Sequence, residues 1–223
     1  MPSHTSEPLQ LPSLLPPDDD LDILHCRQYE TRTYRLDAAT LLIRGAIRDT
    51  KPPGLYIDGD PDPLVIHDML VELTVSIDGF VITDVNVLFI TFPNENCPTI
   101  TTHYRELIGL RIARGFNRKV RELFGGPRGC AHTSALLQAM APAAIQTIWS
   151  LTVKDAREQG RSAEGTPEDM ERSIAANLNT CHIWDENGQQ VQLMRKGDYK
   201  RTGPVSVVER LEALGRDPNE WFS

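Results

Sequence analysis

A thiol and an imidazole lie two residues apart in the stretch GGPRGCAHTSALL, at Cys130 and His132. Glycines precede them and an apolar helical pattern follows, which predicts a helix that begins at these residues. Unpaired N–H groups and the helix dipole favour negative charge there, so a Cys130 thiolate would be stabilised and His132 would exchange its proton. On its own the pattern favours a buried cysteine and a helix cap, because one Cys-x-His pair is a weak signal.

Other residues with suitable chemistry lie at the ends of predicted strands. His67 and Asp68, in VIHDM, begin the clearest predicted strand after a loop rich in proline and glycine. A carboxylate beside a histidine orients the imidazole, although a solvated strand end explains this pair equally well. We therefore take four residues as catalytic candidates, provided that the fold brings them together: His132, His67, Asp68 and Cys130.

Three further residues are candidates for substrate binding. The stretch IRDTK places Arg48, Asp49 and Lys51 at the end of a predicted strand, and Cys97 follows another strand in NENCPTI. Lys51 or Arg48 would meet an anionic group of the substrate. The substrate-binding candidates are therefore Lys51, Arg48 and Cys97.

No organic cofactor is predicted, because the chain has no dinucleotide fingerprint, phosphate loop or nucleophile elbow. A Zn or Fe site is the alternative, since several side chains have suitable ligand types. The ligands would be Cys97, Cys130, His132 and either Asp68 or His67. Their spacings of about thirty residues form no recognised local metal motif, so both interpretations stay open.

Composition argues against a nucleic-acid or membrane partner. The 223-residue chain has a formal net charge of −8, with 40% hydrophobic and 24% charged residues. Phosphate backbones and anionic membranes are held by clustered Lys and Arg, so neither is expected as a partner. No apolar run approaches the length of a membrane span, and the N-terminus lacks a secretory pattern. The four cysteines are far apart in the sequence, which indicates free thiols. From these features together we expect a soluble cytoplasmic protein. Its expected partner is a small-molecule substrate.

Strands are predicted to precede helices along the chain. The strands cover 27–36, 40–49, 69–77 and 80–90, and they form two hairpins that turn at 37–39 and 78–79. The helices cover 102–110, 117–124 and 134–151, and Pro142 should kink or divide the last of these. Because strands and helices do not alternate, we predict an α+β fold whose antiparallel sheet has about three to five strands, with helices packed on one face.

The two ends of the chain are predicted to differ. Residues 1–26 are rich in proline and form a flexible N-terminal arm, while 27–223 form a single α+β domain. A helix over 166–178 is capped by Thr166, and a helix over 204–215 ends at Gly215. Between them a hairpin over 180–195 is expected, opened by Cys181 and His182, to which the sequence assigns no role. An exposed sheet face or the arm would allow a homodimer.

Several quoted segments together resemble the bacterial domain of unknown function family 2889. The matching segments are RDTK, IHDM, the Cys97–Pro98 pair, LIGLRIARGF, GGPRGCAHTSALL and NTCHIW, in the order of the family. They cover roughly Arg27 to Arg195, and one departure is Ala131, where the family usually has threonine. The family label implies no activity.

A weaker resemblance concerns the geometry of the site. The order of the strands, Cys97 and the Cys130/His132 pair is similar to that of iron–sulfur cluster scaffold proteins. That resemblance implies that Asp68, Cys97 and either Cys130 or His132 converge at one exposed site. The chain lacks the scaffold's first cysteine beside Asp68, which argues against cluster assembly, and a shared fold is not a shared function.

Three functional hypotheses follow. The first is a small-molecule enzyme, a lyase that performs elimination or retro-aldol-type carbon–carbon cleavage on an aromatic or other apolar metabolite. In it His132 is the acid or base, Asp68 orients it, and Lys51 or Arg48 binds an anionic group. The second is a Zn- or Fe-binding enzyme or a scaffold-like accessory protein. The third is a non-catalytic binding subunit, and we rank the three in this order.

Overall fold

The computed structural model describes residues 13–163, 168, 171, 174–175, 177–196 and 204–222. The backbone falls into two compact units, Met1–Ala141 and Pro142–Ser223. Most of the helix predicted over 166–178, including its cap at Thr166, lies outside the described residues. The single domain predicted over 27–223 stays a prediction.

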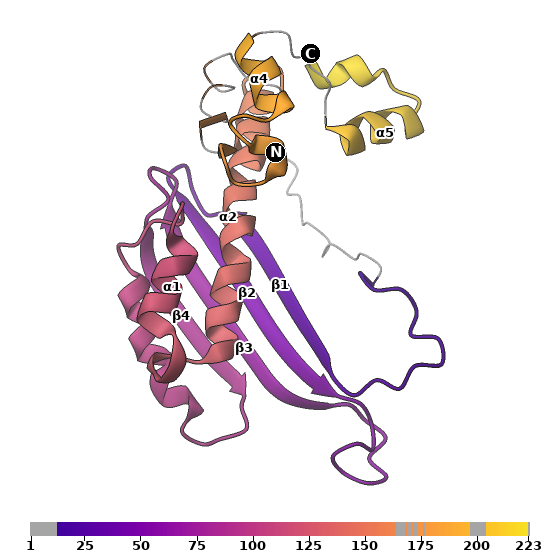
Figure 1. Cartoon of the computed structure of the whole chain (residues 1–223), viewed down its shortest axis with the longest axis vertical. Coiled ribbons are helices and arrows are strands. Elements are labelled where there is room, and N and C mark those ends of the chain that lie inside the picture. Colours follow the sequence, from indigo (N-terminus) through magenta and orange to yellow (C-terminus); the bar gives the residue numbers. More distant parts are fainter. Residues whose placement is uncertain are drawn as a thin grey trace. The chain divides into compact units, whose positions relative to one another are not determined.

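A four-stranded antiparallel sheet forms the framework of the first unit (Figure 1). Its strands, in spatial order, are β1 (Cys26–Arg35), β2 (Thr40–Lys51), β3 (Leu64–Ser76) and β4 (Ile82–Thr91). Apolar residues alternate along β2 and β3, so one face of the sheet is buried. The fully buried residues of that face include Leu41, Ile43, Ile47, Val71 and Leu73. The predicted α+β class and both N-terminal hairpins are confirmed.

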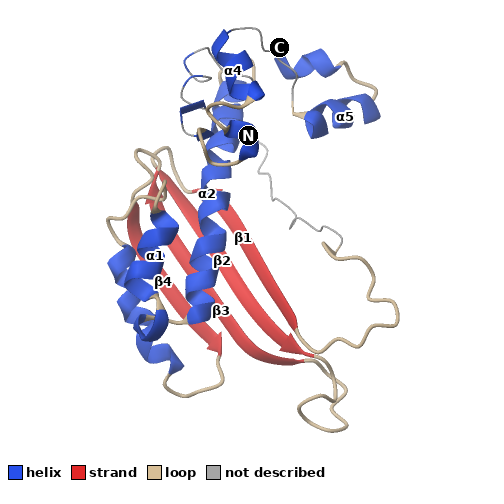
Figure 2. Ribbon diagram, in the orientation of Figure 1, coloured by secondary structure: helices blue, strands red, loops and turns tan. Residues whose placement is uncertain are grey.

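Helical segments of this unit cover the buried face of the sheet (Figure 2). They are η1 (Cys97–Leu107), α1 (Phe116–Phe124), η2 (Gly126–Arg128) and the first part of α2 (Ala131–Glu158). In α1 the buried residues Phe116, Val120 and Phe124 recur every four positions, which is the stripe that a helix on a sheet needs. The first part of α2 buries Leu136 and Met140. The start of α2 is thereby held over the sheet.

One glycine sets the distance between β2 and α2. A Cβ added at Gly45 would lie 2.5 Å from Met140 Sδ, 2.7 Å from Met140 Cγ and 3.1 Å from Leu136 Cδ1. Real Cβ atoms essentially never lie within 3.0 Å of another atom, so a side chain at this position would force the Met140 side chain to move or the helix to shift. The absence of a side chain at Gly45 therefore lets α2 pack directly on β2.

We expect Gly45→Ala to lower the free energy of unfolding by about 1–3 kcal/mol, because it overpacks the contact with Met140. Met140→Ala alone should also destabilise the fold, because it leaves a cavity. Combined, the two changes should destabilise less than the sum of the single changes, since each relieves the other. Urea unfolding of the three variants measures this, and strictly additive values would contradict the proposed contact.

The second unit contains the rest of α2, then η3 (His182–Trp184), α4 (Gln189–Lys196), α5 (Val205–Ala213) and η4 (Pro218–Phe222). Helix α2 continues through Pro142, so it is not divided there. The hairpin predicted over 180–195 is wrong: its second half is helix α4. The Gly188 carbonyl accepts a hydrogen bond from Gln192 N–H, which is the first hydrogen bond of a helix. The residues that follow are Gln, Leu, Met, Arg and Lys, which favour the helical conformation. The C-terminal helix is confirmed as α5.

Helix α2 also corrects the expectation that no apolar run approaches the length of a membrane span. It has 28 residues, its most apolar window has a mean hydropathy of 1.2, and 33% of that window is buried. By length and composition it could cross a membrane, and it is the one such helix among the described residues. Its residues Leu136, Leu137 and Met140 belong to the core of the sheet unit. A cytoplasmic location stays a prediction.

Candidate functional site

A buried carboxylate, Asp49, is the centre of a polar cluster near the end of β2. Its side chain is 2% exposed, and its strand partner in β1 is Arg27. Arg27 Nε donates to Asp49 Oδ1 at 2.6 Å and Arg27 Nη2 donates to Oδ2 at 2.7 Å. These hydrogen bonds lower the pKa of Asp49 to about 2 and raise the pKa of Arg27. Asp49 is therefore ionised at neutral pH.

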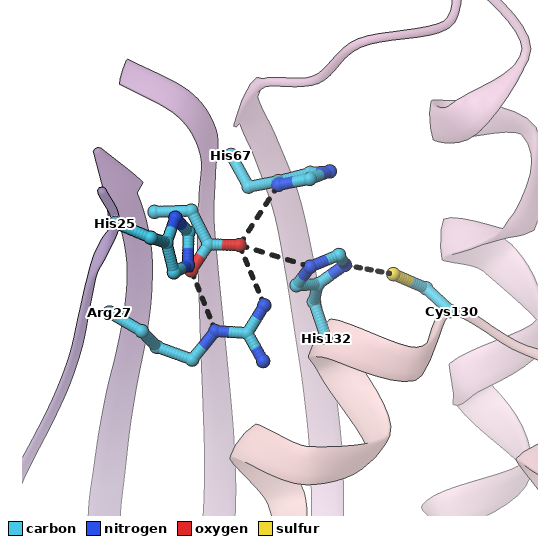
Figure 3. Close-up of polar contacts among 6 residues, drawn as sticks. His25, Arg27, His67, Cys130 and His132 are labelled. Atoms are coloured by element: carbon cyan, nitrogen blue, oxygen red, sulfur yellow. Dashed lines mark hydrogen bonds and ion pairs between the residues drawn. The ribbon is translucent and has the colours of Figure 1, made fainter. Parts of the chain in front are cut away.

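Histidines surround the same carboxylate (Figure 3). His67 Nδ1 lies 3.0 Å and His132 Nε2 lies 3.1 Å from Asp49 Oδ2. The two imidazole rings are neighbours, with centroids 3.9 Å apart. His25 Nε2 lies 3.4 Å from the other oxygen, Oδ1. One carboxylate thus joins side chains from β1, its preceding segment, β3 and α2.

The pairing of the strands explains why these residues meet. In the register of the sheet Arg27 lies opposite Asp49, and Asp49 lies opposite His67. Directly opposite residues of antiparallel strands point to the same face, here the face that α2 covers. Three consecutive strands therefore contribute one row of polar side chains to the inner face.

The position of His132 in the cluster depends on where α2 begins. A Cβ added at Gly129 would lie 2.5 Å from the Phe124 carbonyl oxygen, so the loop before the helix packs too closely for a side chain. The fully buried Tyr104 hydroxyl accepts a hydrogen bond from Cys130 N–H at 2.8 Å. These contacts fix the first turn of α2, which carries His132.

The carboxylate favours one tautomer at each of the two imidazoles. Asp49 Oδ2 forms a hydrogen bond with His67 Nδ1 and lies 3.1 Å from His132 Nε2, so the carboxylate favours the tautomers with the proton on these two nitrogens. His132 Nδ1 is then an acceptor, and Cys130 Sγ lies 3.7 Å from it. Burial, together with the nearby positive charge of Arg27, lowers the pKa of His132 from its ordinary value. His132 is therefore neutral at pH values near 7 and able to accept a proton.

The structure brings three of the four catalytic candidates together and separates the fourth. His67, His132 and Cys130 belong to the cluster, whereas Asp68 is bound by Arg48, with Arg48 Nη2 2.6 Å from Asp68 Oδ2. Successive residues of a strand point to opposite faces, so the Asp68–Arg48 pair lies on the face away from α2. The expectation that Asp68 orients a histidine is corrected: the carboxylate that contacts both histidines is Asp49.

The remaining candidates are not part of the cluster. Lys51 Nζ lies 5.3 Å from the centre of the Tyr56 ring, and Arg48 is paired with Asp68. Cys97 begins η1, and in the described part of the chain it makes no polar contact with Asp49 or the histidines. The metal-ligand set expected from Cys97, Cys130, His132 and Asp68 is not assembled. Within the described ranges, the side chains whose ligand atoms lie within 4.8 Å of one another are Asp49, His67 and His132.

Sequence reasoning missed the roles of Asp49, Arg27 and His25. The signal that could have found two of them is the register of the first hairpin. Its turn at 37–39 places Arg27 opposite Asp49, which marks an ion pair across neighbouring strands. His25 lies within the predicted flexible arm, and no sequence pattern indicated that it contacts Asp49.

Comparison with known proteins adds one finding. A family model described as "Protein of unknown function (DUF2889)" matches residues 25–146. That range contains every member of the cluster: His25, Arg27, Asp49, His67, Cys130 and His132. No curated protein and no solved structure matches the chain.

Proposed function

The chain belongs to the DUF2889 family of proteins of unknown function, and we propose that it is a metal-independent acid–base enzyme. Its reaction is a lyase reaction on a small aromatic or other apolar metabolite, either an elimination or a retro-aldol-type cleavage. The single observation that carries this proposal is that one ionised, buried carboxylate contacts two imidazoles at once.

Two neighbouring imidazoles on one carboxylate provide a base whose orientation is fixed. Asp49 holds His67 by Nδ1 and His132 by Nε2, so Nε2 of His67 and Nδ1 of His132 retain lone pairs. The side chains are 18% and 20% exposed, so both are largely desolvated but not sealed off from solvent. Arg27 keeps Asp49 ionised and fixed. This arrangement has the parts that general base catalysis needs.

In a retro-aldol cleavage one base is sufficient. His132 Nδ1 takes the proton of the substrate hydroxyl as the carbon–carbon bond breaks, and Asp49 stabilises the imidazolium that forms. The imidazolium then returns the proton to the carbanion. In an elimination the same nitrogen takes a C–H proton and returns it to the departing group. In both cases His67 remains beside His132 on the same carboxylate.

The partly exposed side chains around the two histidines support an aromatic or other apolar substrate that also carries an anionic group. Arg27 and His25 are 38% and 39% exposed, and they stand next to the histidines in place of the predicted Arg48 and Lys51. Tyr29 follows Arg27 on the same face of β1 and is 42% exposed. An aromatic ring and a guanidinium together suit a planar substrate. A small molecule is the partner we propose, and a homodimer stays a prediction.

A metal-dependent reaction is the second candidate. The ligand atoms of Asp49, His67 and His132 lie within 4.8 Å of one another, and two imidazoles with a carboxylate suit Zn or Fe. Against it, Arg27 already donates to both oxygens of Asp49, so a cation there would meet a positive charge. The scaffold resemblance required Asp68 beside the cluster, and Asp68 is instead paired with Arg48.

The proposal is tested with purified protein and a panel of aromatic and apolar metabolites that carry a hydroxyl or leaving group β to an acidic C–H. Mass spectrometry follows the products. We expect cleavage of one class of compounds, undiminished by a chelator, and a loss of at least about 100-fold in His132→Gln. His103→Gln, which changes a partly exposed histidine paired with Glu106 and outside the cluster, is the matched control. Activity that needs added Zn or Fe would support the metal alternative.

A further inference from the structure

We infer that Cys130 is a nucleophilic thiol, activated by His132 and Asp49, and that the site binds soft carbon electrophiles covalently. The chemical class is the conjugated carbonyl compounds, whose β-carbon accepts a thiol. This inference goes beyond the lyase function and does not depend on it, because it concerns the reactivity of the protein's own sulfur.

The first support is the order of the three side chains. Asp49 Oδ2 lies 3.1 Å from His132 Nε2, which favours the tautomer that leaves the lone pair on His132 Nδ1. Cys130 Sγ lies 3.7 Å from that nitrogen, within hydrogen-bonding reach for sulfur (Figure 3). A thiol, an imidazole and a carboxylate in this order form the arrangement that activates nucleophilic cysteines. The imidazole takes the thiol proton and the carboxylate stabilises the resulting imidazolium.

The second support is the position of Cys130 at the N-terminal end of the long helix α2. Its carbonyl accepts the N–H of Ser134 at 2.9 Å, so Cys130 is the N-cap residue of α2. The N–H groups of the first turn of such a helix favour a negative charge nearby. The buried Tyr104 hydroxyl holds Cys130 N–H at 2.8 Å and keeps the residue in place. The N-terminal end of the helix and the imidazole therefore both lie where they would stabilise negative charge that develops on Cys130 Sγ as it reacts.

The other cysteines provide an internal comparison. Cys26 and Cys181 are exposed, whereas Cys97 and Cys130 are partly buried. In the described part of the chain, Cys130 is the cysteine whose sulfur contacts an imidazole. If accessibility alone determined reactivity, Cys26 and Cys181 would react first. If the His132–Asp49 pair activates the thiol, Cys130 reacts first despite its smaller exposure.

The covalent step balances without an oxidant or a metal. The thiol proton moves to His132 Nδ1, and Sγ forms a bond to the β-carbon of the conjugated carbonyl compound. The electron pair of the carbon–carbon double bond moves to the α-carbon, which takes the proton back from the imidazolium. One C–S bond and one C–H bond form, one S–H bond and one π bond break, and no group is oxidised or reduced overall.

The experiment measures the rate at which N-ethylmaleimide labels each cysteine of the full chain at neutral pH, by mass spectrometry of peptides. We expect Cys130 to react about tenfold faster than any other cysteine. His132→Gln should lower the Cys130 rate about tenfold and leave Cys26, Cys97 and Cys181 unchanged. His182→Gln is the matched control, because it removes the histidine adjacent to Cys181 in sequence and should leave the Cys130 rate unchanged.

Two results would overturn the inference. One is a wild-type Cys130 rate no greater than that of exposed Cys26 or Cys181. The other is an unchanged Cys130 rate in folded His132→Gln, with folding checked by circular dichroism. The wild-type comparison needs no variant, so a misfolded variant does not prevent the test. Labelling also needs no substrate, so its failure is distinct from a failure of the lyase proposal.

Discussion

Asn in place of Asp49 is expected to lower the free energy of unfolding by about 2–3 kcal/mol at neutral pH. The carboxylate is 2% exposed and its pKa is lowered to about 2, chiefly by the hydrogen bonds from Arg27. A shift of that size corresponds to about 2 kcal/mol of stability in the ionised form. An asparagine of the same shape cannot bind the guanidinium as an ion, and it presents one oxygen in place of two. Urea unfolding measures the difference.

The pH dependence of that loss has a definite sign. A carboxyl group whose folded pKa is lowered stabilises the fold above its unfolded pKa of 3.8, and that stability is lost as the pH falls towards about 2. The difference between wild type and Asp49→Asn should therefore be full above about pH 4 and should shrink between about pH 4 and pH 2. A constant difference across this range would contradict the assignment of the ion pair to Asp49.

The matched control is Asp68→Asn. It also removes a carboxylate bound by an arginine on a neighbouring strand, but on the face of the sheet away from α2. We expect it to leave the maleimide reactivity of Cys130 unchanged, whereas Asp49→Asn should lower it. Equal effects of the two variants on Cys130 would show that general loosening of the sheet, not the contact with His132, controls the thiol.

Loss of the base His132 should have the largest effect on turnover. We expect His132→Gln to lower kcat/KM by about 100- to 10,000-fold on the substrate class found, because glutamine cannot exchange protons, and His67→Gln to lower it less, because His67 only packs beside the base on Asp49. The double variant should lose no more than about the larger single loss, since residues that act as a unit are not additive. Initial rates of the three variants provide the comparison. Losses that multiply would indicate two independent roles.

The pH profile separates a catalytic role of His132 from a structural one. Burial lowers the pKa of His132 from its ordinary value, so the base remains unprotonated at neutral pH. The rate should therefore be constant near neutral pH and should fall only below the usual titration range of histidine. A rate that already falls on acidification from pH values near 7 would contradict this role.

Local patterns predicted the sheet and its covering helices well, because each segment carries its own period. Alternation along β2 and β3 identified a half-buried sheet, and the spacing of Phe116, Val120 and Phe124 matches a helix on that sheet. The hairpin predicted over 180–195 was wrong because a short apolar run beside a turn fits either a strand or a helix. Helix-favouring residues determined the outcome there.

The candidate site could be predicted only in part, because it depends on register. His67, Cys130 and His132 were identified by residue type and position at the ends of elements. Asp68 was chosen over Asp49 since it adjoins His67 in sequence, but adjacent residues of a strand point to opposite faces. Only the pairing of β2 with β3 shows that Asp49 lies beside His67.

The most direct test of the account is the tautomer of each histidine, read from long-range proton–nitrogen NMR spectra of the full chain at neutral pH. We expect opposite tautomers: His67 protonated on Nδ1 and His132 protonated on Nε2, because both nitrogens face Asp49. Asp49→Asn should abolish this difference, and Asp68→Asn should preserve it. The same tautomer at both histidines in the wild-type chain, or spectra that Asp49→Asn leaves unchanged, would contradict the central role of Asp49.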